Sequence, residues 1–483
     1  MSNNINELSP KTLWSNFASL CNIPRPSKHE AKAVEFVIDF AKKHNLEYVT
    51  DEVGNVVIRK PATKGYESKP GIVLQGHLDM VPQKNSATIH DFEKDPILPR
   101  IDGDWVKATG TTLGADNGMG VSAALAVLES TDLHHGPVEA LFTIDEETGM
   151  TGAFNLKGDM LKGRILINLD SEEEGELCIG CAGGLNTSAV FTFTPETIPA
   201  GSKAFKINLT GLKGGHSGVD IHLGRGNANK LMNRVLWKAS RELGLRIASI
   251  DGGNLRNAIP RESFVTAVIP AASEKAFLNL IAEFQGFFTN ELGSIEPNIH
   301  IATEPAELPE KIFDATTQTN LLNAVYVIPN GVIRMESDMP GVVETSTNLA
   351  IIKSEGNTIE IKCLLRSSIE SAKTDLANAM TSVFELAGAA VTHDGGYPGW
   401  KPNVDSPILK TMKTVYKEKF GKEAIVNVIH AGLECGIIGD VYKGMDMVSF
   451  GPTIVNPHSP DEKVNIPSVE KFWTYLTETL KSV

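Results

Sequence analysis

Four short apolar segments of this chain each lead into acidic or histidine side chains, the types that bind metal ions. Each segment is too short for a core helix and is rich in β-branched residues, which is typical of a buried strand. Sites in open α/β sheets form at the carboxyl ends of the strands. The pattern therefore predicts an α/β sheet with a polar site along one edge. The segments and the side chains that follow them are residues 72–75 with His77 and Asp79, 141–144 with Glu146 and Glu147, 165–169 with Asp170, and 447–450 with His458.

Helices alternate with strands in the first part of the chain. Ser27 and Glu30 have the spacing of a capping box, and apolar residues at helical spacing follow them, which predicts a helix over 28–44. Residues 121–128 have the same helical spacing and follow a glycine-bearing turn. The alternation predicts an α/β fold with a mixed sheet that helices cover on both faces. Strands are expected at 55–58, 71–75, 138–144 and 164–169.

The middle of the chain has a different pattern and is expected to form an inserted domain, residues 187–398. A strand-and-helix order occurs there and then recurs more weakly, which predicts an α+β domain that is duplicated within itself. Turn-rich linkers are expected at 194–199 and 395–402. The elements of the first copy are expected at 205–209, 227–243, 263–269 and 274–290, and those of the second at 349–353, 358–365 and 371–387.

The α/β pattern returns after residue 400. Strands are expected at 425–429 and 447–450, and a closing helix at 469–480. The first domain is therefore predicted to be discontinuous, built from residues 1–186 and 399–483.

Charge and cysteine content argue against several functional classes. Lys and Arg total 45 against 59 Asp and Glu, so the net charge of −14 repels phosphate backbones and anionic membranes, and no nucleic-acid or membrane partner is expected. No basic region followed by an apolar stretch opens the chain, and no 18 consecutive residues are apolar, so an unexported soluble protein is expected. Five scattered cysteines fit the reducing cytoplasm. Cys178 and Cys181 alone cannot complete a four-ligand zinc site, which favours buried thiols.

Counting ligands and charges favours two metal ions. Three carboxylates and a hydroxide carry about four negative charges, which two divalent cations neutralise and one does not. A carboxylate that bridges two ions roughly 3.5–4 Å apart is the usual dinuclear arrangement. Asp79 lies two residues after His77 and is expected to orient its imidazole rather than bind metal. The expected ligands are His77, Asp116, Glu147, Asp170 and His458.

Glu146 and Glu147 are neighbours, so their side chains diverge and can take different roles. One carboxylate can bind metal while the other accepts a proton from the attacking water and passes it to the leaving amine. Each acidic group also has a plainer interpretation. A single Asp at a strand end is usually a turn former, and an acidic run such as 172–176 is usually solvated. The recurrence of these groups after several buried strands favours the site.

Six motifs in this order resemble those of the zinc-dependent di- and carboxypeptidase family that includes carnosinases and aminoacylases. The resemblance spans essentially the whole chain. It implies a catalytic domain with two zinc ions, for which Co²⁺ or Mn²⁺ could substitute, and an inserted lid. It also implies that Asp116 bridges the metals and that Glu146 is the base. The motifs are His77-Leu-Asp79, residues 112–118 around Asp116, residues 145–149, Asn168-Leu-Asp170, Gly214-Gly-His216-Ser-Gly, and His458.

Lid residues are expected to recognise the ends of a substrate. The resemblance assigns His216 to the oxyanion and, more weakly, Asn257 to a substrate contact. Arg366 ends a strand whose counterpart in the first copy, 266–269, has no basic residue, and its guanidinium suits a carboxylate, although a surface ion pair is the alternative. Glu434 could receive a free amine or could simply begin a helix.

Together with the metal-ligand pattern, the resemblance implies a metallodipeptidase that hydrolyses unblocked dipeptides, including Xaa-His, with a metal-bridged hydroxide as the nucleophile. One alternative is an N-acyl amino-acid deacylase with the same metal site. Another is a non-catalytic peptide-binding protein on the same scaffold, against which the base at Glu146 argues. The partners expected are dipeptide substrates and a second copy in a homodimer, although the duplicated lid leaves the oligomeric state open.

Overall fold

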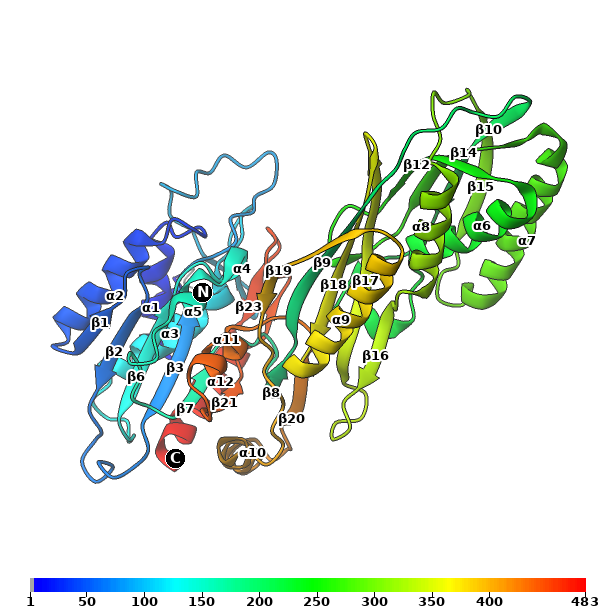
Figure 1. The fold of residues 1–483 in the computed structure, drawn as a ribbon. Helices are drawn as coiled ribbons and strands as arrows, with labels where there is room; N and C mark the ends of the chain where they lie inside the picture. Colours follow the sequence, from blue (N-terminus) through cyan, green and yellow to red (C-terminus); the bar gives the residue numbers. More distant parts are fainter. Residues whose placement is uncertain (1–3) are drawn as a thin grey trace. The chain divides into compact units, whose positions relative to one another are not determined.

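The computed structural model describes residues 4–483, which divide into two compact units. Unit 1 contains residues up to Gly180, Trp400–Val428 and Leu433–Val483. Unit 2 contains Cys181–Gly399 and the short segment Ile429–Gly432. The chain therefore leaves unit 1 and returns to it, as Figure 1 shows by the blue and red ends of the sequence within one unit.

Unit 1 is built on an eight-stranded mixed sheet. Its strands, in spatial order, are β1 (Glu47–Thr50), β2 (Val56–Lys60), β6 (Val138–Thr143), β3 (Ile72–His77), β7 (Ile165–Asn168), β21 (Asp446–Ser449), β8 (Glu176–Cys181) and β20 (Ile425–Ile429). The central strands β6, β3, β7 and β21 are parallel, so their carboxyl ends lie along one edge. A smaller sheet contains β22 (Ile454–Val455), β23 (Lys463–Asn465), β5 (Trp105–Lys107) and β4 (Arg100–Asp102).

Helices cover the central strands of unit 1. All residues of β3 and β6 are buried, as expected for parallel strands that are covered on both faces. Helix α3 contacts both strands and packs against α1, whereas α10 contacts β21 and α12. The helices of this unit are α1 (Lys11–Cys21), α2 (Ala31–Lys43), α3 (Ala115–Glu129), α4 (Glu146–Gly149), α5 (Thr151–Asn155), α10 (Pro407–Phe420), α11 (Glu434–Val441) and α12 (Ile466–Ser482), with a 3₁₀ turn at Ile5–Glu7.

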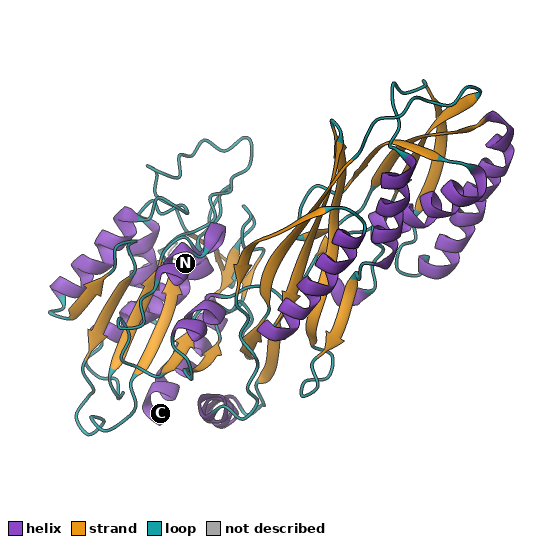
Figure 2. Ribbon diagram, in the orientation of Figure 1, coloured by secondary structure: helices purple, strands orange, loops and turns teal. Residues whose placement is uncertain are grey.

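Unit 2 has a sheet of its own with a helical layer (Figure 2). Its strands, in spatial order, are β15 (His300–Ala306), β10 (Ser202–Thr210), β14 (Ser263–Pro270), β12 (Arg246–Gly252), β17 (Val343–Glu355), β18 (Thr358–Ser367), β9 (Gly183–Thr192) and β19 (Ala390–Tyr397), and β16 (Gly331–Met335) pairs with β17. The helices are α6 (Ala228–Leu243), α7 (Glu274–Leu292), α8 (Ala315–Val327) and α9 (Glu370–Leu386), and a 3₁₀ turn lies at Ile221–Leu223. A short ribbon pairs β11 (Gly215–His216) with β13 (Ala258–Ile259).

Two copies of one topology make up this sheet. In chain order β10, α6, β12, β14, α7 and β15 form a βαββαβ unit, and β9, α8, β17, β18, α9 and β19 form another. In both, the first and third strands are central, the fourth lies beside the first, and the second lies beside the third. The two copies join through their second strands, where Asp251 pairs with Lys353 and Gly252 with Ile352. The first copy is inserted after the first strand of the second, which explains why the sequence repeat is weak.

One apolar core holds the helices of unit 2 against its sheet. It includes Phe205, Phe277 and Phe288 from the first copy and Phe191 and Phe384 from the second, all buried. Helix α6 contacts both α7 and α8, and α8 contacts α9, so the four helices form a continuous layer. The shared core indicates that the two copies fold as one unit.

Two local predictions from the sequence are wrong. The expected capping box is not formed, because α2 begins at Ala31, the Ser27 hydroxyl donates to Asp79, and Glu30 accepts the backbone N–H of Lys28. The turn-rich segment 194–199 does not lead into unit 2 but lies within it, between β9 and β10. The other expected elements of the sequence analysis are present, with ends that shift by a few residues.

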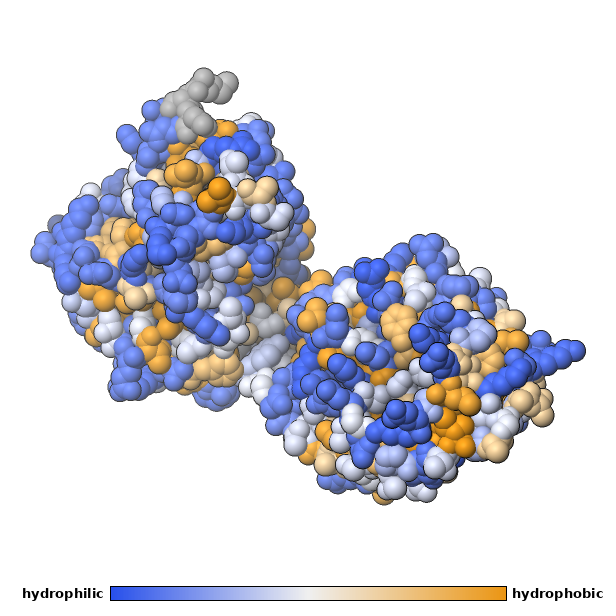
Figure 3. Space-filling view, turned by 90° about the horizontal axis from the view of Figure 1, so that it is seen from above, coloured by the Kyte–Doolittle hydropathy of each residue, from blue (hydrophilic) through white to orange (hydrophobic). Residues whose placement is uncertain are grey.

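The surface in Figure 3 is mostly hydrophilic, with apolar side chains scattered across it. Among residues 4–483, each helix is too short or too polar to span a lipid bilayer. All five cysteines are buried and remain thiols.

Candidate metal centre

The expected metal ligands lie at the carboxyl edge of the parallel strands. His77 is the last residue of β3, and Asp170 follows β7 by two residues. Glu146 and Glu147 open α4, which begins just after β6. His458 follows β22 in the loop beyond β21. The first turn of α3 packs closely against β3 at Gly76, where a Cβ atom would clash with Oδ1 of Asn117.

The side chains form two triads that share Asp116. In the first, Nε2 of His77 lies 3.2 Å from Oδ1 of Asp116 and 3.2 Å from Oδ1 of Asp170. In the second, Nε2 of His458 lies 3.1 Å from Oδ2 of Asp116 and 3.0 Å from Oε2 of Glu147. Each triad has the size of a metal site, since its ligand atoms lie within 4.8 Å of one another. Asp116 thus presents one carboxylate oxygen to each triad.

Nitrogen and carboxylate donors in these triads fit divalent metal ions such as zinc. Among residues 4–483, Oε1 of Glu147 is buried without a hydrogen-bond donor, and Oδ1 of Asp170 is buried beside Nε2 of His77 without a well-formed hydrogen bond. Burial and the neighbouring carboxylates raise the pKa of Asp170 to about 7, although His77 opposes this shift. Buried carboxylates without donors are costly unless a cation compensates them. The donor set and its unmatched oxygens therefore fit divalent metal ions.

The Asp79 carboxylate lies beside the imidazole of His77. Its Oδ1 lies 3.3 Å from Nδ1 of His77, while Nε2 of the same ring faces the first triad. The Asp79 carboxylate also accepts the backbone N–H groups of Glu146 and Glu147 and the hydroxyl of Ser27. Burial alone would raise the pKa of Asp79, but His77 and these donors lower it to about 2. Asp79 is therefore an anion that binds the start of α4 and lies against the His77 ring.

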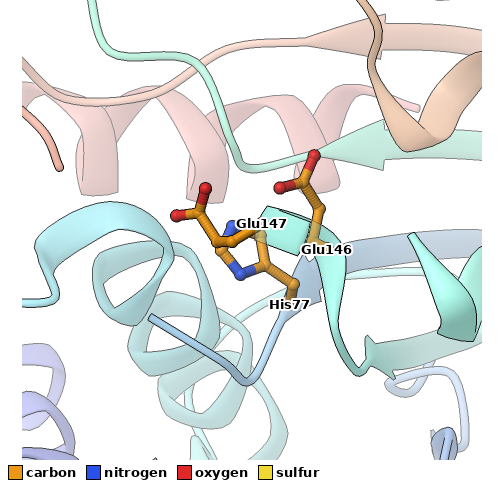
Figure 4. A group of neighbouring side chains, drawn as sticks. All are labelled: His77, Glu146 and Glu147. Atoms are coloured by element: carbon orange, nitrogen blue, oxygen red, sulfur yellow. The ribbon is translucent and has the colours of Figure 1, made fainter. Parts of the chain in front are cut away.

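The carboxylates of Glu146 and Glu147 point in different directions, as Figure 4 shows. Glu147 approaches His458, whereas Glu146 has no ion pair among residues 4–483. Burial raises the pKa of Glu146 well above its usual value, and the nearby carboxylates of Asp170 and Glu434 add to this shift while His77 opposes it. A carboxylate with a raised pKa is suited to accept and return a proton.

Glu434 lies beneath this edge in a buried polar row. Its Oε2 accepts hydrogen bonds from Nε2 of Gln75 at 2.6 Å and from Oγ1 of Thr143 at 2.7 Å, and its Oε1 is buried without a donor. Gln75, Asn168 and Ser449 pair across β3, β7 and β21 and continue the row through side-chain hydrogen bonds. Burial raises the pKa of Glu434 to about 7. Glu434 does begin α11, but its side chain points into this buried network.

Arg366 is a buried cation near the end of β18 in unit 2. Its side chain is 4% exposed, and among the described residues it makes no ion pair. Nη1 donates to the hydroxyl of Tyr397 at 3.1 Å, and Nε is buried without an acceptor. The alternative interpretation of a surface ion pair is therefore wrong. The loop after β11 approaches this guanidinium at Gly218, where a Cβ atom would clash with the carbonyl oxygen of His430.

In unit 2, His216 ends β11 and Asn257 immediately precedes β13. Nδ1 of His216 accepts the backbone N–H groups of Gly218 and Val219 at 3.2 and 3.0 Å. Burial and the positive charge of Arg366 lower the pKa of His216, so the ring is neutral with its proton on Nε2. The backbone carbonyl of the exposed Asn257 accepts the N–H of Ser217.

Sequence reasoning missed three side chains of these regions. Glu172 was counted in a solvated acidic run, but burial and the charges of Asp116 and Asp170 raise its pKa to about 8. Its position two residues after Asp170 was a usable signal. Tyr397, which contacts Arg366, lies in a segment that was interpreted as a linker, and Glu462 contacts the loop of Asp116 from 346 residues away. No spacing rule in the sequence points to either contact.

Comparisons with known proteins identify a family and relatives of this chain. A family model described as "Peptidase family M20/M25/M40" matches residues 73–482. The cytosol non-specific dipeptidase of Escherichia coli (strain K12) is 48% identical over 479 residues, with 99% of each chain covered. The crystal structure of aminoacylhistidine dipeptidase from Vibrio alginolyticus has a TM-score of 0.95 and 49% identity, and covers 99% of this chain and 98% of that one.

A more distant structure, aminopeptidase PepT from Bacillus cereus ATCC 10987, shares the fold, with a TM-score of 0.58 at 17% identity and coverage of 98% of this chain and 99% of that one. The motifs of the sequence predict similarity to the bacterial aminoacyl-histidine dipeptidase, and the comparisons confirm it. They also confirm the α/β fold class with mixed sheets.

Proposed function

Peptidase family M20/M25/M40 is the family to which this chain belongs, and on that premise we propose that it hydrolyses unblocked dipeptides, including Xaa-His, with two zinc ions. The observation that carries the proposal is the pair of triads that share Asp116, because one carboxylate presents a separate oxygen to each ion position. His77 and Asp170 would hold one ion, and His458 and Glu147 the other. Co²⁺ or Mn²⁺ could replace zinc with the same donors.

When bound, two divalent ions lower the pKa of a water molecule and polarise the peptide carbonyl. Glu146 would accept the proton of that water and return it to the leaving amine, a role that fits a buried carboxylate which makes no ion pair among residues 4–483. Asp79 keeps the proton of His77 on Nδ1, so that Nε2 presents its lone pair toward the first triad. Nε2–H of the neutral His216 donates a hydrogen bond to the oxyanion.

The two charged ends of a dipeptide have matching groups in this chain. We assign the free carboxylate to Arg366, whose buried guanidinium lacks an anion and has an unused Nε donor. The free amine is assigned to Glu434, whose Oε1 is buried without a donor. Asn257 is assigned a further substrate contact on the strength of its link to the His216 loop. These assignments support a dipeptidase over an N-acyl amino-acid deacylase, which needs no carboxylate to receive an amine.

We further propose that residues 1–186 and 399–483 form the catalytic domain and that 187–398 form the lid. A cytoplasmic location fits the buried thiols and the name of the Escherichia coli relative. Homodimerisation stays a prediction, which sedimentation of the purified protein tests.

The test of the function is hydrolysis of unblocked dipeptides by the purified protein, before and after removal of metal with a chelator. We expect activity that the chelator abolishes and that zinc restores, with about two zinc ions per chain by elemental analysis. N-acetylated amino acids serve as the matched alternative substrates. Hydrolysis of these alone would support the deacylase, and binding of dipeptides without turnover would support the non-catalytic alternative.

A further inference from the structure

The carboxylate of Glu462 accepts hydrogen bonds from four consecutive backbone N–H groups. Oε2 lies 2.7 Å from the nitrogen of Leu113 and 2.9 Å from that of Gly114, and Oε1 lies 2.7 Å from the nitrogen of Ala115 and 3.3 Å from that of Asp116. The Glu462 side chain is 2% exposed. A buried carboxylate with this many backbone donors fixes the path of the loop that it binds.

Arg25 binds the same segment, residues 113–116, through the carbonyl group of Gly114. The buried guanidinium donates from Nη2 to the carbonyl of Gly114 at 2.5 Å, and from Nη1 to the carbonyls of Leu78 and Asp79 at 2.9 and 2.8 Å. The 113–116 loop is therefore tied to the loop that follows His77. The Glu462 carboxylate therefore binds the N–H groups of residues 113–116, and the Arg25 guanidinium binds a carbonyl group of the same segment.

Regular secondary structure does not determine the position of Asp116. Helix α3 is interrupted at Asp116 and Asn117, whose backbone angles are not helical, and Gly114 has a left-handed conformation. The N–H of Asp116 is itself one of the donors to Glu462. The backbone from which the shared carboxylate projects is therefore held by side chains that are distant in the sequence.

Glu462 ends a turn that the hydrogen bond from its N–H to the carbonyl of Ser459 closes, and His458 immediately precedes this turn. His458 contacts the Asp116 side chain, and Glu462 contacts the Asp116 backbone. The segment 458–462 thus presents one expected metal ligand and binds the backbone of another.

We propose that Glu462 is a positioning residue that sets the metal affinity of the centre, by holding the backbone of Asp116 in register with His458. Arg25 supports it from the carbonyl side of the loop. The proposal rests on the proposed metal-dependent function. It assigns Glu462 no contact with metal or substrate.

The test compares Glu462→Gln with Glu296→Gln. Glu296 is a buried carboxylate of unit 2 that also accepts backbone N–H groups, from Lys213 at 2.8 Å and Gly226 at 3.0 Å, so its variant controls for the general loss of such a contact. Zinc affinity is measured on the metal-free proteins by competition with a chromogenic chelator. The absorption spectrum of the Co²⁺-loaded proteins reports the geometry at the ions, and thermal unfolding of the metal-free proteins reports stability.

We expect Glu462→Gln to weaken zinc binding by roughly 10- to 100-fold, as for other residues that orient metal ligands. Its Co²⁺ spectrum should change, and kcat should fall more than KM rises. Glu296→Gln should leave zinc affinity within about twofold of the original protein, although it lowers the unfolding temperature too. Glu462→Asp keeps the charge but is too short to reach all four N–H groups, so an intermediate loss is expected. It replaces Glu462→Gln if that variant does not fold.

Unchanged zinc affinity and an unchanged Co²⁺ spectrum in the folded Glu462 variants would overturn the proposal. Equal losses of affinity in Glu462→Gln and Glu296→Gln would overturn it too, since the effect would then be one of general stability. If the original protein itself binds no zinc, the proposed function fails rather than the role of Glu462.

Discussion

His458 and Asp116 are 342 residues apart in the sequence, yet Nε2 of His458 lies 3.1 Å from Oδ2 of Asp116. The other oxygen of Asp116 faces His77 at 3.2 Å. Asp116 therefore joins a histidine from the first third of the chain to one from its last segment. Because unit 1 is discontinuous, its second triad is complete only after the chain has returned from unit 2.

Replacement of His458 by alanine should lower metal content and activity together, since the second triad loses its only nitrogen donor. Elemental analysis of the dialysed variant should give about one zinc ion per chain, with dipeptide turnover lost in parallel. His300→Ala, at an exposed histidine of β15, serves as the control and should change neither. Two tightly bound ions and normal turnover in His458→Ala would remove His458 from the centre.

Glu146→Gln should keep both ions and lower kcat by on the order of 10²-fold or more, because the amide cannot accept the proton of the attacking water. The neighbouring variant Glu147→Gln is the matched comparison and should lose an ion, since Glu147 contacts His458 in the second triad. Metal analysis and single-turnover kinetics of the two variants separate these roles. Loss of an ion from Glu146→Gln would make Glu146 a ligand.

Acid sensitivity should arise partly from His430, which is 7% exposed and bonded through Nε2 to Oγ of Ser346. Burial, with the positive charge of Arg366, lowers the pKa of His430 to about 3. In the unfolded chain this histidine takes up a proton near its ordinary pKa of about 6.5, whereas in the folded chain it does not until about pH 3. Between these two pH values the unfolded state therefore binds more protons than the folded state. The free energy of unfolding falls as the pH drops from about 6.5 to about 3.

His430→Gln keeps a partner for Ser346 but does not titrate. Between pH 7 and 5, the metal-free original protein should lose about 2 kcal/mol more of its free energy of unfolding than the variant does. Urea denaturation at the two pH values measures the difference. Equal losses in both proteins would show that His430 is protonated in the folded state as well.

Much of unit 1 can be predicted from the sequence because the relevant signals are local. Buried parallel strands appear as continuous apolar runs, and strand ends place His77 and Asp170 at one edge without knowledge of the contacts. The hydroxyl of Ser27 shows where local reasoning fails. Its spacing to Glu30 predicts a helix cap, but the hydroxyl binds Asp79 instead, which is a tertiary contact.

Contacts of high sequence separation could not be predicted. Glu462 binds a loop about 350 residues away, and the link between Arg366 and Tyr397 joins a strand to an expected linker. The inserted copy inside unit 2 separates β9 from α8, so the second βαββαβ unit is not contiguous in the sequence. Helix and strand periodicity extends over only a few residues, so it does not reveal that one copy is inserted between β9 and α8.

Arg366 provides a test of how the enzyme selects substrates by length. If its guanidinium binds the terminal carboxylate of a dipeptide, a third residue moves that carboxylate out of reach and amidation removes the charge. Loss of such a bidentate contact costs about 1.5–3 kcal/mol, so Arg366→Ala should lower kcat/KM on dipeptides by on the order of 10- to 100-fold. The loss on dipeptide amides should be much smaller. Arg366→Lys should recover little, because an ammonium cannot replace the planar fork.

The decisive quantity is the ratio of kcat/KM for a dipeptide to that for its amide, in the original protein and in Arg366→Ala. Tyr397→Phe should lower this ratio in the same direction but less, because it removes only the hydroxyl that orients Nη1. Arg256→Ala is the matched cationic control, since Arg256 donates to Ser188 and also makes no ion pair among residues 4–483. A ratio that falls in Arg256→Ala and not in Arg366→Ala would assign carboxylate binding to Arg256 instead. The guanidinium that binds the terminal carboxylate is the one whose removal makes the dipeptide and its amide equivalent substrates.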